Sequence, residues 1–218
     1  ILIRLPFKNN IMYLPKHFAV DDPAILAQLI AEYPLATVVG NLENQLEVNH
    51  LPLMLSPDKT KLHGHIARVN PLVKIASSPH PQVTAIFHGP NAYVTPAWYP
   101  SKKETGKVVP TWNYAVVHVQ GTLKLIENAQ WLRNHVAQMT NIHEPTYQSN
   151  WQLDDAPEDY VQMMLRAIIG IEIDVNSLTG KFKLSQNRPP EDYDAVVKTL
   201  DQSPAEILQA MRKYMKSN

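Results

Sequence analysis

Val109-Pro110-Thr111-Trp112-Asn113-Tyr114-Ala115-Val116-Val117-His118 is the stretch that decides most about the fold of this chain. A proline fixes the backbone of a loop, and a hydroxyl, a large flat aromatic ring and an amide follow just before an apolar strand. A flat cofactor with polar edges needs such a stacking face, such hydrogen-bonding groups and such a rigid frame. The alternative is an ordinary barrel corner in which Trp112 packs as part of the core.

The strand that follows this loop is predicted to run from Tyr114 to Ile126, with alternate side chains on opposite faces. Turns are predicted at Gly40-Asn41 and at Ser56-Pro57-Asp58. Further strands are predicted at Leu35–Val39, Leu46–Leu55, Leu62–Ile66, Val83–Phe87 and along the alternating Ile169, Ile171, Ile173 and Val175. Strands and helices do not alternate regularly, so a parallel sheet is not expected. The pattern predicts a mainly β fold with flanking helices, of the α+β class, built on a β-barrel.

Helix signals surround these strands. Asp22 is a capping residue, Pro23 suits the first helical turn, and Pro34 ends the helix. Other helices are predicted at Arg68–Ala76, after Asn128, from Pro157, and at Pro190–Leu200 and Pro204–Met215.

A second unusual run is Gly180-Lys181-Phe182-Lys183-Leu184-Ser185-Gln186-Asn187-Arg188-Pro189. Together with other short words in a fixed order, it resembles the PaiB family of FMN-binding negative transcriptional regulators. These words are Met12-Tyr13-Leu14-Pro15, His50-Leu51-Pro52-Leu53, Gly64 to Pro71, Phe87-His88-Gly89-Pro90, Tyr93 to Tyr99, Pro110 to Tyr114, and Gly180 to Asn187. The resemblance implies an FMN-binding split β-barrel with C-terminal helices, usually a homodimer with cofactor sites at the subunit interface.

The similarity to this family begins at Met12 and covers nearly the whole chain. Residues 1–11 are therefore interpreted as an upstream extension or a cloning remnant, and residues 12–218 as a single domain. Lys plus Arg and Asp plus Glu balance at 20 each, so no broad attraction to nucleic acid or anionic membranes is expected. The chain has no cysteine and no apolar run long enough for a bilayer, and a cytoplasmic protein is expected.

A phosphate site is predicted at the strand-to-helix junction from Gly64 to Asn70, where Arg68, Asn70 and Lys74 supply donors on neighbouring turns of the following helix. Residue types alone favour a structural interpretation, in which Arg68 and Lys74 are solvated helix positions and Asn70-Pro71 is a helix cap and start signal. The family resemblance places the FMN phosphate at this junction, and it adds His65 and Ala67 to the expected contacts.

The remaining cofactor contacts are predicted in the two unusual runs. Thr111, Trp112, Asn113 and Tyr114 offer a ring and polar groups to the flavin. Ser185 and Gln186 are assigned to the cofactor only because the resemblance places their run near the cofactor or the dimer seam. Lys181 and Lys183 flank Phe182, a pattern that a solvated edge strand would also show.

Metal binding is a weaker interpretation. His63 and His65 lie on one face of a strand, and His50, His88 or His118 could extend the pair. Arg68-Val69 stands where an acidic ligand would be needed, so no metal is predicted. Haem is kept as a minor alternative to FMN because split barrels of this type host both.

Three functions remain open: an FMN-binding transcriptional regulator, a flavin- or haem-dependent oxidoreductase, and a cofactor-free dimeric scaffold. No catalytic residue is predicted, since the chain lacks cysteine and a Gly-x-Ser-x-Gly elbow. A homodimer is expected because the apolar run Leu51–Leu55 is too apolar to face water. DNA as a partner has weak support, because acidic residues offset the basic ones of the last two helices.

Overall fold

The computed structural model of the chain describes residues 12–216. The predicted upstream extension, residues 1–11, lies outside the described residues. Eight strands form a sheet in the order β3-β2-β6-β7-β8-β5-β4, and β1 pairs with β8. The strands are β1 (Ala19–Val20), β2 (Leu35–Leu42), β3 (Gln45–Pro52), β4 (Met54–Leu55), β5 (Lys61–Ala67), β6 (Gln82–Val94), β7 (Thr111–Ile126) and β8 (Ile168–Lys183).

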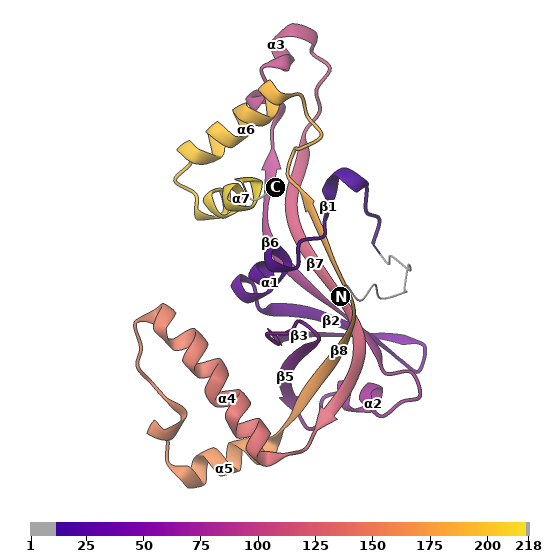
Figure 1. Cartoon of the computed structure of the whole chain (residues 1–218), viewed down its shortest axis with the longest axis vertical. Helices are drawn as coiled ribbons and strands as arrows, with labels where there is room; N and C mark the ends of the chain where they lie inside the picture. Colours follow the sequence, from indigo (N-terminus) through magenta and orange to yellow (C-terminus); the bar gives the residue numbers. More distant parts are fainter. Residues whose placement is uncertain (1–11, 217–218) are drawn as a thin grey trace. The chain divides into compact units, whose positions relative to one another are not determined.

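Most helices lie where the sequence predicts them (Figure 1). Asp22 accepts a hydrogen bond from the backbone of Ala24 at 2.8 Å, and Asn128 caps α4 through the backbone of Trp131. The helices are α1 (Pro23–Glu32), α2 (Leu72–Ala76), α3 (Ser101–Thr105), α4 (Ala129–His143), α5 (Glu158–Ala167), α6 (Pro190–Gln202) and α7 (Glu206–Lys216). Short 3₁₀ turns are η1 (Lys16–Phe18), η2 (Pro96–Trp98), η3 (Glu144–Tyr147) and η4 (Leu153–Asp155).

The predicted turn at Gly40-Asn41 is wrong, because both residues belong to β2. The hairpin turns at Glu43 and Asn44, whose φ values of 52° and 64° fit a two-residue turn. Gly40 serves packing instead: a Cβ at this position would lie 2.8 Å from Cδ1 of Ile75. The strand predicted at Val83–Phe87 is also too short, since β6 continues to Val94.

The chain divides into two compact units. The described part of the first unit consists of residues 12–33, 86–118 and 178–216, and the second unit consists of residues 34–85 and 119–177. Strands β6, β7 and β8 contribute residues to both units.

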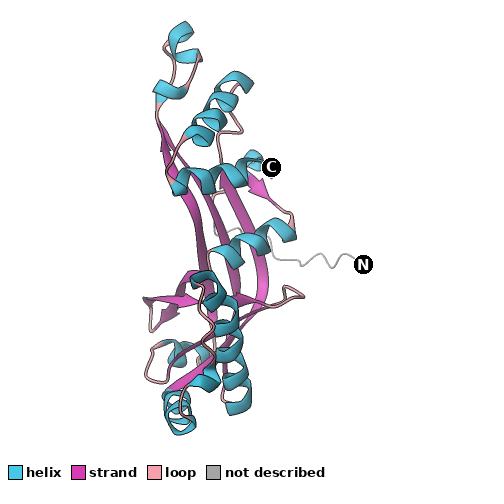
Figure 2. Cartoon of the chain, turned by 90° about the vertical axis from the view of Figure 1, so that its left-hand side faces the viewer, coloured by secondary structure: helices cyan, strands magenta, loops and turns pink. Residues whose placement is uncertain are grey.

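In the first unit, helices α1 and α7 cover one face of the strands (Figure 2). Phe182 of β8 and Tyr214 of α7 are fully buried and meet edge to face, with ring centroids 5.4 Å apart. Gly180 lets α1 approach closely, since a Cβ there would lie 2.3 Å from Cδ2 of Leu26. The side chains on this face are therefore core.

In the second unit, α4 and α5 lie beside each other (Figure 1) around a small apolar core of Leu132, Val161 and Leu165. The ring of Trp131 lies directly on β8, because Gly170 has no side chain there; a Cβ would lie 2.4 Å from the indole. Between residues 12 and 216, no helix has the length and apolar character needed to cross a membrane.

Candidate functional site

The opposite face of the first unit carries aromatic rings and cations. Strand β7 alternates, so Trp112, Tyr114 and His118 point to one side, while Asn113 points to the buried side. Lys181 and Lys183 of β8 lie beside these rings. We call Trp112, Tyr114, His118, Lys181 and Lys183 the lysine–aromatic face.

Lys181 is almost completely buried, with 9% of its surface exposed. Its Nζ donates a hydrogen bond of 2.8 Å to the carbonyl of Tyr13 and lies 5.6 Å from the centre of the Tyr114 ring. Strand β1 pairs with β8 at this residue, matching Ala19 to Lys181. The interpretation of this run as a solvated edge strand is therefore wrong.

Lys183 donates from Nζ to the hydroxyl of Thr111 and, at 2.6 Å, to the carbonyl of Trp112. Burial lowers the pKa of Lys183, and the positive charges of Arg188 and Lys181 lower it further. Within residues 12–216, no carboxylate lies within salt-bridge distance of Lys181 or Lys183. Both ammonium groups thus lack an anionic partner within the described chain.

A cavity of about 400 Å³ opens beside Lys181. Tyr114, His118 and His88 line it together with Lys181, and Nδ1 of His118 is buried without a hydrogen-bond partner. Burial lowers the pKa of His118, as do the charges of His88 and Lys181. Unpaired cations and flat rings suit an anionic ligand with an aromatic body, which is the chemistry of FMN.

Asn113 and Ser185 form a buried pair on the other side of β7. Nδ2 of Asn113 donates to the Ser185 hydroxyl at 2.8 Å, and that hydroxyl lies 3.2 Å from Oδ1 of Asn113. Asn113 and Trp112 therefore do not share a face. Alternation along the strand could have indicated this from the sequence, but the partner Ser185, 72 residues away, could not be found that way.

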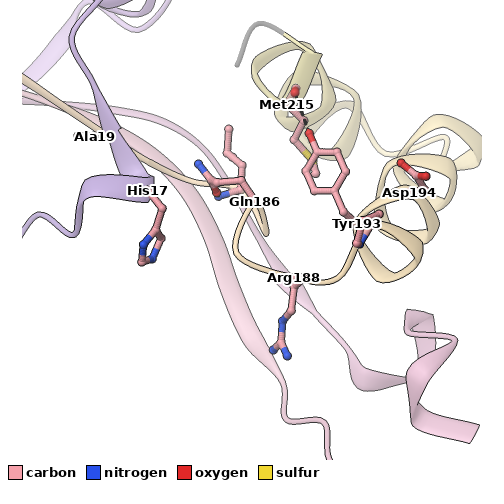
Figure 3. A pocket seen from close by; sticks show the side chains of 9 residues that line it. His17, Ala19, Gln186, Arg188, Tyr193, Asp194 and Met215 are labelled. Atoms are coloured by element: carbon pink, nitrogen blue, oxygen red, sulfur yellow. Dashed lines mark hydrogen bonds between the residues drawn. The ribbon is translucent and has the colours of Figure 1, made fainter. Parts of the chain in front are cut away.

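Gln186 turns back on its own loop, where its amide donates to the carbonyl of Phe182 and accepts from the backbone of Leu184, both at 2.6 Å. It also borders a second cavity of about 510 Å³ in the first unit, shown in Figure 3. Arg188 reaches into this region and lies 4.7 Å from the centre of the Tyr99 ring.

The predicted phosphate junction lies in the second unit, and one part of the prediction is wrong. Arg68 and Asn70 precede α2 rather than lie on it, because that helix begins at Leu72 and contains only five residues. Asn70 accepts from the backbone of Leu72 at 2.9 Å and donates to Asn49 at 2.7 Å, so both ends of its amide have partners. Lys74 is exposed on α2.

Arg68 has partners of its own. Its Nε donates to the carbonyl of Arg166 at 2.9 Å, and its Nη1 lies 3.7 Å from Glu127. Ala67, the last residue of β5, has an exposed side chain. At this junction, a phosphate could therefore contact only the part of the Arg68 guanidinium that lies outside these two contacts.

His65 meets residues that the sequence did not connect with it. Its ring packs edge to face on His135 at 5.4 Å, and His135 stacks on Trp131 at 5.0 Å. His63 instead pairs with Glu172 at 3.1 Å. Across residues 12–216, no group of three or more His, Asp or Glu side chains is arranged to hold a metal ion.

The sheet and its flanking helices define the class of the protein: an α+β flavin-binding split β-barrel, as predicted. The fold is similar to that of the flavocytochrome Anf3 from Azotobacter vinelandii, with a TM-score of 0.60 and 12% identity over 84% of this chain and 78% of that one. It is also similar to the FAD and haem binding protein from Mycobacterium smegmatis, with a TM-score of 0.57 and 14% identity over 76% and 73% of the two chains.

Residues 12–177 match the family described as "Putative FMN-binding domain", and the chain belongs to this family. It is 30% identical to the protease synthase and sporulation protein PAI 2 of Bacillus subtilis, over 87% of this chain and 89% of that protein. It is 33% identical to an uncharacterized protein of Emericella nidulans, over 85% and 89%. The predicted PaiB relationship and the prediction of FMN as cofactor are thereby confirmed.

Proposed function

We propose that this protein is an FMN-binding transcriptional regulator and that FMN binds against the lysine–aromatic face of the first unit. One observation carries the proposal: Lys181 and Lys183 have no carboxylate partner in the described chain, and Lys181 lies beside Tyr114 and a cavity. FMN combines a flat ring with a phosphate dianion, so it can stack on the ring and pair with the ammonium groups. Bound FMN would supply flavin redox chemistry.

The regulator is proposed to act as a cytoplasmic homodimer in which residues 12–218 form one domain. Strands β6, β7 and β8 run through both units, which supports a single domain. The basis for the dimer differs from the sequence argument, because Leu51 and Leu53 are buried within the chain. Exposed apolar side chains lie instead on β2 and β3, at Leu35, Leu46 and Val48.

Direct DNA contact by α6 and α7 has little electrostatic support. Arg212 pairs with Asp201, and Lys213 pairs with Glu32. These contacts neutralise two of the basic side chains that a helix entering a DNA groove would use. The proposed regulation therefore relies on the dimer and its flavin rather than on a basic recognition helix.

The second candidate is a flavin- or haem-dependent oxidoreductase, favoured by the fold that the chain shares with a flavocytochrome. An absorbance spectrum of protein purified without added ligand separates the two cofactors. Flavin bands support the FMN proposal, whereas a Soret band supports haem.

Titrations with FMN and with riboflavin, which lacks the phosphate, test where the phosphate binds. Replacing both lysines (Lys181→Met with Lys183→Met) removes charge-assisted contacts of about 1.5–3 kcal/mol each, so FMN affinity should fall by about a hundredfold to ten-thousandfold if both contact the phosphate. Riboflavin affinity should change little. Lys102→Met, an exposed lysine on α3, is the matched control.

Arg68→Ala tests the alternative position of the phosphate, at the junction of β5 and α2. If this variant loses FMN affinity and the lysine variant does not, the phosphate binds at the junction predicted from the sequence. If riboflavin and FMN bind wild type equally well, neither cation group holds a phosphate.

A further inference from the structure

The second unit contains a half-open apolar cavity of about 280 Å³ between α4, α5 and the end of β5. Its walls are almost entirely carbon. They include the side chains of Trp151, Tyr160, Met164, Leu165, Val136 and Ala156. Trp151, Tyr160 and Met164 are each 43–51% exposed, so the cavity is open to entry on the side that they form.

An imidazole also belongs to this wall. His65 lines the cavity, and its Nδ1 is buried without a hydrogen-bond partner. Next to it lies His135, which is only 4% exposed and whose Nε2 is also buried without a hydrogen-bond partner. Both nitrogens have almost no accessible surface, so a bound group can reach the His65 imidazole only through the ring edge that lines the cavity.

The histidines also limit the charge of such a group. Burial lowers the pKa of His65, and burial together with the charges of His65 and His63 lowers the pKa of His135 to about 4. Both imidazoles are therefore neutral near pH 7 and offer no charge to an anion. A charged ligand would lose its hydration in this cavity without gaining an ion pair.

We propose that this cavity binds a small, neutral aromatic molecule with one hydroxyl group, and that the hydroxyl pairs with the imidazole of His65 at the ring edge that lines the cavity. A hydroxyl both donates and accepts, so it fits either tautomer of the imidazole. The volume lies just below the usual range for drug-sized ligands, which corresponds to about one or two rings. Trp151 and Tyr160 provide aromatic contacts for the ring system.

The site is distinct from the proposed flavin site, whose residues belong to the first unit. FMN is a dianion, and the cavity contains no cationic side chain among its lining residues. A molecule that binds here would give the protein a second ligand, which a regulator could use as its signal.

Three matched probes test the proposal on the full-length protein by isothermal titration calorimetry: 2-naphthol, naphthalene and 2-naphthoate. We expect one molecule of 2-naphthol to bind per chain, about two- to tenfold more tightly than naphthalene, as one hydrogen bond would provide. The 2-naphthoate anion should bind more weakly than either. Equal binding of all three probes, or no binding of 2-naphthol, overturns the proposal.

Variants locate the site. Ala156→Phe fills the cavity and should abolish 2-naphthol binding, while His65→Leu should erase the preference for 2-naphthol over naphthalene. Met163→Ala changes an exposed residue of α5 that does not line the cavity and should bind like wild type. Retention of 2-naphthol binding by Ala156→Phe overturns the proposal even if His65→Leu fails to fold.

A competition experiment with FMN tests whether the cavity is separate from the flavin site. Protein saturated with FMN should bind 2-naphthol as well as flavin-free protein does. Competitive displacement of 2-naphthol by FMN would show that the cavity is part of the flavin site, and would overturn the proposal of a separate ligand.

Discussion

Replacing Trp112 by alanine should weaken FMN binding while leaving the protein folded. Trp112 is 56% exposed, and its described ring contact is an edge-to-face contact with Tyr93 at 5.9 Å. A fully buried Trp→Ala change costs about 3–5 kcal/mol, so a side chain less than half buried should cost about 1–2 kcal/mol. In a chain of this size, that loss lowers the melting temperature by about 2–8 °C.

The same substitution removes an aromatic face from the proposed flavin site. Such stacking contributes about 0.5–1.5 kcal/mol, which predicts about two- to tenfold weaker FMN binding. Quenching of flavin fluorescence during a titration measures the affinity, and a thermal melt of the same sample measures stability. Trp151→Ala is the matched control, because Trp151 is 43% exposed and belongs to the second unit.

Two results would contradict a role of Trp112 in flavin binding. A drop in stability of the size expected for a buried tryptophan would show that Trp112 is a structural residue of the core. Unchanged FMN affinity per folded molecule, or an equal loss in Trp151→Ala, would remove Trp112 from the flavin site.

Three further substitutions test the packing of each unit. Asn113→Ala should destabilise the protein by about 1–3 kcal/mol in urea unfolding, because it leaves the buried hydroxyl of Ser185 without its partner; an unchanged midpoint would contradict this. Burial raises the pKa of Glu32, but hydrogen bonds from Lys213, Gln28 and Tyr214 outweigh it and the pKa is lowered below 4.5. The stability advantage of wild type over Glu32→Gln should therefore be complete above that value and disappear as pH falls further; an advantage independent of pH would refute it. Burial lowers the pKa of His135 to about 4, so between pH 6.5 and 4 the unfolded chain binds the proton more readily. As the pH decreases across this window, the free energy of unfolding should decrease in wild type and decrease less in His135→Leu. Parallel curves for the two proteins would exclude a contribution of His135 to the pH dependence.

The local structure of this chain was accessible from its sequence. Asp22 followed by Pro23, and Asn128 before its helix, are caps whose hydrogen bonds join residues only two or three positions apart. The alternation along residues 114–126 predicted which side of β7 each residue occupies, because the period of a strand is set by its own backbone. The fold class followed from the family motifs and their order, which can be recognised along the chain without knowledge of any tertiary contact.

Other features depended on contacts between distant residues, which no local pattern encodes. The lysine pair looked like an exposed edge, but β1 pairs with β8 there and buries Lys181 under the ring of Tyr114. Asn113 and Ser185, and His65 and His135, become neighbours only when separate strands and helices pack together.

Gly40 shows the difference at a single position. From the sequence, a glycine before an asparagine is a turn signal, and the tertiary structure uses the same glycine to admit Ile75 against β2. The sequence alone determined where most strands and helices form and to which family the chain belongs. Packing alone decided which side chains face a cavity, which are buried in pairs and which cations stay without a partner, because burial and hydrogen bonding depend on all the segments that meet at a point.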